Sequence, residues 1–209
     1  MYILNSHGDI CYPIEQTVNI DKLNESVSAL FIRLGISKEL FLKDLEKYQI
    51  VTLNISHLST LTGTDRWKKY AGNHPSLIAQ SVSEIDFTQF LTEMDDLYIK
   101  EVLDDIFAYH ENKFGKKFQG RCQLIASRSP QCYKMHKDLH TSHRYHIPLE
   151  TDERFLWLFE DDNKDIALLH MPSDGRIWYL NPMTAKHTVI HVGSDIRFHI
   201  LLTSSIIQS

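Results

Sequence analysis

Paired cysteines, an excess of basic residues and long apolar runs are all missing from this 209-residue sequence. Cys11, Cys122 and Cys132 are odd in number and form no Cys-x-x-Cys pair, so neither a disulfide framework nor a thiolate zinc site is predicted. The formal net charge of −5 argues against general nucleic-acid binding, because phosphate contacts require a basic face. A reducing compartment fits these absences best.

The pattern also lacks a membrane anchor and a secretion signal. No stretch approaches the roughly 18 apolar residues of a membrane-spanning helix. Residues 1–14 include Asp9 and show no basic region followed by an apolar run. A composition of 43% hydrophobic and 23% charged residues excludes disordered, collagen-like and coiled-coil classes. The sequence therefore predicts a cytoplasmic protein without a membrane partner, folded as a single domain over 1–209.

Helical periodicity is concentrated in the first half of the chain. Apolar residues recur at intervals of three and four after Asp21, Ser37 and Asp95, and Gly35 and Gly115 provide stop signals. These patterns predict helices over 21–34, 37–45 and 95–114. The less regular stretch 54–94 mixes cations with aromatic residues at 64–70, which favours a solvated loop with anchoring rings over a segment that faces a substrate or partner.

Short β-prone runs separated by turn residues follow Gly115. Seven strands at this spacing predict a sandwich or a jelly roll, so the fold class is α+β. We expect a mainly helical portion over 1–115 that braces a β core over 116–209, and this core carries the site. The predicted strands are 120–127, 143–149, 154–159, 166–171, 175–180, 187–192 and 196–203.

Histidine is the residue type present in excess. Eight of the 12 histidines fall between 136 and 199, where even spreading would place about four. Imidazole is the commonest protein ligand for metals and titrates near neutral pH. The clustering therefore suggests metal or acid–base chemistry in the C-terminal half.

The spacing of particular residues selects one candidate site. His136 and Asp138 form a His-x-Asp pair, and alternate residues of an extended segment point to the same side. His187 follows 51 residues after His136, with predicted strands between them, and Arg197 comes ten residues later. Two histidines and one carboxylate form the facial triad that holds Fe(II) and leaves positions open. A guanidinium on the next strand suits the distal carboxylate of 2-oxoglutarate.

A rival set has nearly the same spacing. His7, Asp9, His57 and Arg66 repeat the pattern near the N-terminus. Two predicted helices fill the gap between His7 and His57, so no strands are expected to bring the second histidine back beside the first. We therefore prefer the C-terminal set.

The C-terminal segments 136–149, 175–182 and 187–197 together resemble the aspartyl/asparaginyl β-hydroxylase-like group of Fe(II)/2-oxoglutarate oxygenases. The resemblance covers about residues 118–204 and implies a cupin-like double-stranded β-helix that uses Fe(II), 2-oxoglutarate and O2 and releases succinate and CO2. It also implies site roles by position: His136 and His187 match the metal histidines, Arg197 the distal-carboxylate arginine, and Arg144 with His146 the pair that assists co-substrate binding.

One departure from the family pattern bears on the metal. The animal enzymes that name the group lack the metal carboxylate, whereas Asp138 is present here, as in bacterial relatives that hydroxylate free proline. The lumenal context of the animal enzymes is absent too, so their substrate does not carry over. The resemblance implies an amino-acid substrate, either free or within a peptide or protein.

Alternatives remain open at the level of the sequence. His199 shares strand parity with Arg197, so it is predicted either to contact the co-substrate or to be satisfied by hydrogen bonding. A non-catalytic cupin-like module that binds a small acid would use the same residues. A cupin dioxygenase or isomerase that uses no keto acid is a further alternative, and Arg197 argues against it.

Overall fold

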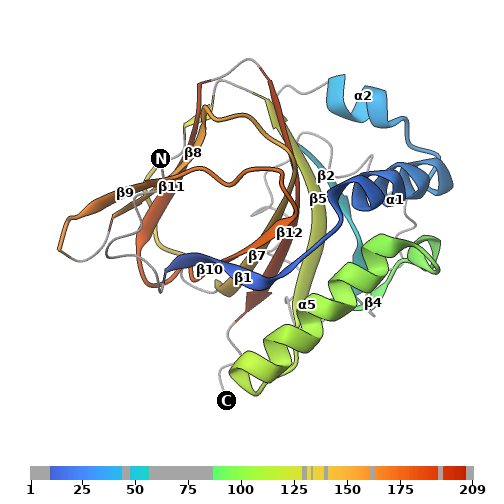
Figure 1. Ribbon diagram of the computed structural model, residues 1–209, viewed down its shortest axis with the longest axis horizontal. Coiled ribbons are helices and arrows are strands. Elements are labelled where there is room, and N and C mark those ends of the chain that lie inside the picture. Colours follow the sequence, from blue (N-terminus) through green and yellow to red (C-terminus); the bar gives the residue numbers. More distant parts are fainter. Residues whose placement is uncertain are drawn as a thin grey trace.

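The computed structural model describes residues 10–43, 48–56, 87–128, 131–132, 134–138, 141–160, 163–192 and 195–205. Two antiparallel sheets face each other, and helices cover the outer side of the larger sheet (Figure 1). Among these described residues, no helix is long and apolar enough to cross a membrane.

The larger sheet has six strands, and the smaller sheet facing it has four. From β5 to β12 the chain moves repeatedly between the two sheets, and every strand pairing is antiparallel. In spatial order the larger sheet contains β1 (Cys11–Thr17), β10 (Arg176–Leu180), β7 (Thr141–Glu150), β12 (Ile196–Ser205), β5 (Gly120–Arg128) and β2 (Tyr48–Thr52). The smaller sheet contains β6 (Gln131–Cys132), β11 (Lys186–His191), β8 (Phe155–Glu160) and β9 (Ile166–Leu169).

All seven predicted strands are present, and the structure adds others to them. The portion expected to be mainly helical supplies both edges of the larger sheet, β1 and β2, as well as the separate pair β3 (Asn54–Ser56) and β4 (Phe87–Phe90). Pro13 lies within β1, and proline in a run argues against a strand unless the strand lies at an edge. Short, irregular edge strands of this kind carry too little periodicity to be recognised in the sequence.

The helices begin a few residues later or earlier than their patterns indicate. They are α1 (Ile20–Arg33), α2 (Lys38–Lys43) and α5 (Tyr98–Phe114), with a 3-10 turn, η2, at Thr92–Met94. The side chain of Asn19 caps α1 by accepting a hydrogen bond from the Lys22 amide (3.0 Å), so the predicted cap Asp21 instead lies in the first turn. Gly115 ends α5 in the left-handed region (φ 68°), as predicted.

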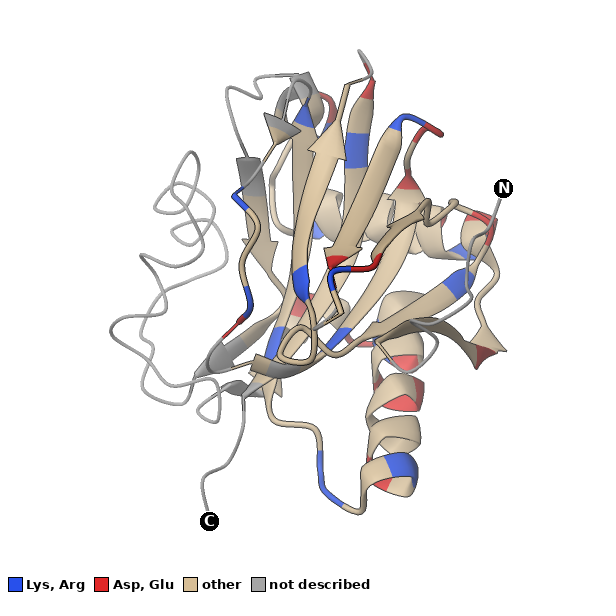
Figure 2. Ribbon diagram, turned by 90° about the vertical axis from the view of Figure 1, so that its left-hand side faces the viewer, with Lys and Arg blue, Asp and Glu red and all other residues tan. Residues whose placement is uncertain are grey.

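Alternation along the strands divides the larger sheet into two faces. Tyr145, Ile147, Phe198 and Ile200 point to one side and belong to the same hydrophobic core as the buried residues of α1 and α5. The acidic residues of α5, red along its ribbon in Figure 2, are exposed. A second, smaller core lies between the two sheets and is built around aromatic residues such as Trp157. The other parity of each strand therefore faces the smaller sheet.

Two histidines lie on the helix-facing side of the larger sheet. His110 Nδ1 is 2.9 Å from the Tyr145 hydroxyl, His143 Nδ1 is 2.9 Å from the Tyr179 hydroxyl, and the two imidazole centroids are 4.8 Å apart. Burial, with a smaller contribution from His143, lowers the pKa of His110 from its ordinary 6.5 to about 4. His110 therefore stays neutral in the folded protein under mildly acidic conditions.

Acidification should destabilise the fold in part through His110. Between pH 6.5 and about 4 the unfolded chain binds a proton at this residue and the folded chain does not. The free energy of unfolding therefore falls as the pH falls, by at most about 3 kcal/mol from this group. His110→Asn keeps a polar group near Tyr145 and should make the pH dependence shallower in urea unfolding at a series of pH values. An unchanged slope in the variant would contradict this assignment.

Candidate metal centre

The face of the larger sheet that is turned towards the smaller sheet carries several polar side chains although it is buried. The exposed fractions of Ser127, His146 and His199 are 1%, 2% and 2%. Burying a polar group without a partner costs free energy, so a buried polar sheet face indicates a bound ligand. The polar residues of this parity are Arg144 and His146 on β7, Arg197, His199 and Thr203 on β12, and Arg121, Gln123 and Ser127 on β5.

Backbone hydrogen bonds bring the three predicted metal ligands together. His136 and His187 form an isolated antiparallel bridge in which each amide donates to the other's carbonyl, at 3.1 and 2.8 Å. The Asp138 amide donates to the Pro182 carbonyl (3.1 Å), at the turn that precedes β11. Residues 51 apart in the sequence are thus fixed by main-chain geometry, which is more rigid than side-chain contact alone.

The three side chains converge on one point. The nearest oxygen of Asp138, Oδ1, is 3.5 Å from His136 Nε2 and 4.0 Å from His187 Nε2, and one ligand atom from each residue lies within 4.8 Å of the others. His136 Nδ1 lies 2.8 Å from the Lys134 carbonyl and His187 Nδ1 lies 3.4 Å from the Ala185 carbonyl. Donation from each Nδ1 leaves both Nε2 lone pairs directed at the common point.

The electrostatics of these histidines suit a divalent cation. His187 is 1% exposed, and burial, followed by the nearby Arg144, lowers the pKa of its imidazole to about 4. A neutral imidazole is the form that binds metal, so His187 is ready to bind near neutral pH without losing a proton. Its Nε2 has no hydrogen-bond partner among the described residues. The donor set of two imidazoles and one carboxylate therefore fits Fe(II).

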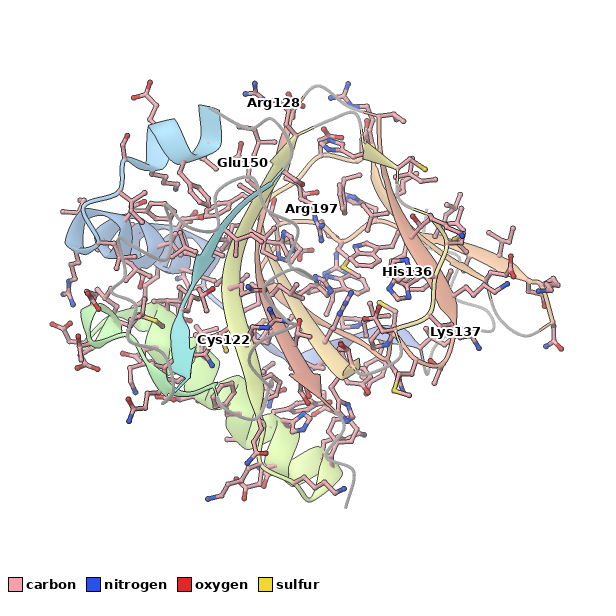
Figure 3. The ribbon with its side chains drawn as sticks, turned by 180° about the vertical axis from the view of Figure 1, so that it is seen from behind. Cys122, Arg128, His136, Lys137, Glu150 and Arg197 are labelled. Carbon is pink, nitrogen blue, oxygen red and sulfur yellow. The ribbon has the colours of Figure 1, made fainter. Side chains whose placement is uncertain are left out.

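Arg197 crosses from the larger sheet to the smaller one. Its guanidinium carbon is 4.0 Å from the ring centroid of Phe155 and 5.5 Å from that of Trp157, both on β8. In Figure 3, Arg197 and His136 project from opposite sides into the region between the sheets. Ser127 lies directly across from Arg197 in the β12–β5 register, and its buried hydroxyl has no partner among the described residues. A guanidinium and a hydroxyl thus lie on neighbouring strands at the same level of the sheet.

Two neutral histidines lie between the metal-binding group and Arg197. The rings of His146 and His199 stack with centroids 5.5 Å apart, and His146 also meets Trp157. Burial first, and then Arg197, lowers the pKa of each imidazole. Neither ring nitrogen of His146 has a hydrogen-bond partner within the part of the chain that the structure describes. These rings therefore have hydrogen-bonding capacity to offer a polar ligand.

Arg144 has a partner that the sequence analysis did not anticipate. Its guanidinium forms an ion pair with Oδ2 of Asp138, the oxygen that faces away from the two histidines. One carboxylate oxygen is thus left for a metal while the other is held by Arg144. The predicted contact of Arg144 with the co-substrate stays a prediction.

Several residues of this region were missed, and others cannot be placed. The sequence analysis did not select Ser127, Gln123, Arg121 or Trp157. The three β5 residues lie on the same face of the sheet as Arg197, so the pairing of β5 with β12 is the signal that could have found them. The rival set of His7, Asp9, His57 and Arg66 lies outside the described residues, as does the segment 64–70.

Comparisons with known proteins identify the fold. No protein-family model matches the sequence, and no curated protein matches it. A prolyl-4-hydroxylase from Pseudomonas putida aligns with a TM-score of 0.53 at 8% identity, over 94% of this chain and 92% of its own. A prolyl hydroxylase from Trichoplax adhaerens, in complex with a peptide fragment of the hypoxia inducible factor oxygen degradation domain, aligns with a TM-score of 0.53 at 12% identity, over 97% and 85%. The chain therefore has the jelly-roll type of fold found in 2-oxoglutarate-Fe(II) oxygenases.

Proposed function

We propose that this protein is an Fe(II)- and 2-oxoglutarate-dependent dioxygenase that hydroxylates an amino acid, either free or within a peptide or protein. The observation that carries the proposal is the convergence of His136, Asp138 and His187 opposite Arg197 within a jelly-roll fold. The alternation of β5 to β12 between two sheets supports a double-stranded β-helix core. The spacing of the motifs supports the aspartyl/asparaginyl β-hydroxylase-like group.

His136, Asp138 and His187 would hold the metal through two Nε2 atoms and Asp138 Oδ1. Fe(II) bound there would supply the O2-dependent decarboxylation of 2-oxoglutarate to succinate and CO2, coupled to hydroxylation of a C–H bond. The carbonyls of Lys134 and Ala185 keep the two rings in the required tautomer.

The remaining polar side chains would position the co-substrate. Arg197, with the Ser127 hydroxyl beside it, binds the distal carboxylate in this proposal, because a guanidinium forms paired hydrogen bonds with a carboxylate. His146 and His199 lie along the path from the metal-binding group to Arg197 and donate hydrogen bonds to the bound acid. The aromatic rings of Phe155 and Trp157 exclude water and keep Arg197 extended.

Oxygen consumption with 2-oxoglutarate tests the proposal directly. Purified protein loaded with Fe(II) should consume O2 and release succinate only when 2-oxoglutarate is present, and amino-acid or peptide substrates should increase the rate. Zn(II)-loaded protein is the control, because zinc fills the site without redox chemistry. Absence of both 2-oxoglutarate binding and succinate release would contradict the proposal. Binding of 2-oxoglutarate without O2 consumption would instead favour a cupin-like module that binds a small acid.

A further inference from the structure

Part of the buried polar face lies beyond the residues used so far. Arg121 and Gln123 of β5 and Thr203 of β12 share the parity of Arg197, and their exposed fractions are 8%, 3% and 6%. Thr203 is opposite Arg121 on one side and Arg144 on the other, so two arginines stand in one row across three strands. This row is at the end of the sheet where Arg144 meets the metal-binding carboxylate Asp138.

The row is too far from Arg197 to serve the same carboxylate. Ser127, which is opposite Arg197, lies six residues from Arg121 along β5. A strand rises about 3.4 Å per residue, so the two Cα atoms are about 20 Å apart. In Figure 3 their neighbours along the strand, Arg128 and Cys122, lie towards opposite ends of β5. Arg121 is therefore placed for a second ligand group.

Gln123 lies beside this row, opposite Leu201, and its burial points to a ligand. Its side-chain Nε2 is buried and has no hydrogen-bond partner among the described residues. An unsatisfied buried donor costs on the order of 1–3 kcal/mol, which a bound acceptor would recover. Arg121, two residues away with the same parity, adds a guanidinium whose paired donors match the two oxygens of a carboxylate.

Charge favours an anionic ligand here. The described inward residues of the larger sheet include three arginines, Arg121, Arg144 and Arg197, whereas the carboxylate facing them, Asp138, is already paired with Arg144. A divalent metal would add two positive charges, and 2-oxoglutarate would remove two. The metal and the co-substrate together therefore leave the charge contributed by these arginines unchanged, and a low dielectric strengthens the attraction between a guanidinium and an anionic group.

We propose that Arg121 and Gln123 bind a carboxylate of the substrate that is hydroxylated. This inference rests on the proposed oxygenase function and adds a substrate class to it: an amino acid that presents a carboxylate, either its own α-carboxylate or an acidic side chain within a peptide. Strands are about 4.8 Å apart, so Arg121 stands about 10 Å from Arg144 across β12. That span accommodates an amino acid held by its carboxylate beside the metal-binding group.

The test compares acids with their amides. Succinate release by the Fe(II)-loaded protein is measured with each common free L-amino acid. It is also measured with aspartate and glutamate whose amino group is acetylated and whose α-carboxylate is blocked as an N-methylamide. Each of these acids is compared with the compound in which its free carboxylate is replaced by a carboxamide. We expect at least one acid to increase the rate of succinate release, whereas its amide should not. The free and the blocked compounds distinguish an α-carboxylate from an acidic side chain. In Arg121→Gln the half-saturating concentration of that acid should rise at least about tenfold, as expected for loss of a charge-assisted pair.

Controls separate this inference from the proposed function and from misfolding. Arg128→Gln removes an exposed arginine of the same strand and should leave stimulation unchanged. Arg121→Lys keeps the charge and should retain part of the affinity, and thermal unfolding checks that each variant folds. The affinity for 2-oxoglutarate, measured by calorimetry, should be the same in Arg121→Gln and the wild type.

Three outcomes would overturn the inference. They are equal stimulation of succinate release by acids and their amides, no stimulation by any acid, and a wild-type half-saturating concentration in Arg121→Gln. Weakened 2-oxoglutarate binding in Arg121→Gln would also overturn it, and absence of such binding in the wild type would remove the proposed function as well.

Discussion

Replacement of His187 by alanine should abolish tight metal binding and lower 2-oxoglutarate turnover by at least about two orders of magnitude. Loss of a residue that merely orients a metal ligand costs roughly 10- to 100-fold in affinity or activity, so loss of the ligand itself should exceed that range. His187 is also held by main-chain hydrogen bonds to His136, so its side chain can be removed with little change in the backbone. Calorimetric titration with Mn(II) measures the affinity, and succinate release measures turnover.

His170→Ala is a matched control for this variant. His170 is half-buried, and its Nδ1 lies 3.1 Å from the Phe155 carbonyl, outside the metal-binding group. It should retain wild-type metal affinity, and a comparable loss in both variants would indicate general destabilisation. Wild-type Mn(II) affinity in His187→Ala would exclude His187 as a ligand.

Replacement of Arg197 by glutamine should raise the 2-oxoglutarate concentration needed for half-maximal turnover by about 10- to 100-fold. Hydrogen bonds to charged groups contribute roughly 1.5–3 kcal/mol, and each 1.4 kcal/mol corresponds to a factor of ten in affinity. The metal-binding residues are untouched, so the turnover number at saturating 2-oxoglutarate should fall much less. Initial rates of succinate release over a range of 2-oxoglutarate concentrations separate the two effects.

Two further variants sharpen the test of Arg197. Arg197→Lys retains the charge but not the paired donors, and it should give an intermediate half-saturating concentration. Mn(II) affinity without 2-oxoglutarate should be unchanged in Arg197→Gln, because Arg197 lies against the rings of Phe155 and Trp157 and is not a member of the metal-binding group. An unchanged requirement for 2-oxoglutarate would exclude Arg197 as the distal-carboxylate residue.

The helices and the central strands were predictable because their signals are local. The periodicity after Asp95 and the stop at Gly115 describe α5, although the helix begins only at Tyr98. The strand edges were not predictable in the same way. β1 contains Pro13 and β2 is five residues long, so both depend on pairing with a neighbouring strand for their structure.

The residues of the candidate site were also predictable only in part. Spacing selected His136, Asp138, His187 and Arg197. The structure brings His136, Asp138 and His187 together. Ser127 and Gln123 were missed because an alternating strand has two faces, and the sequence does not say which of them is buried. Polar residues usually occupy the solvent face, and here the facing four-stranded sheet covers them.

The sequence by itself determined local periodicity, strand parity and the spacing of the metal-binding residues. Only the tertiary structure decided that the polar parity of β5, β7 and β12 faces inward, and that Arg121 shares a row with Arg144. The physical reason is that parity follows from the backbone of one strand, whereas burial and neighbourhood follow from hydrogen bonding and packing between segments that are distant in the chain.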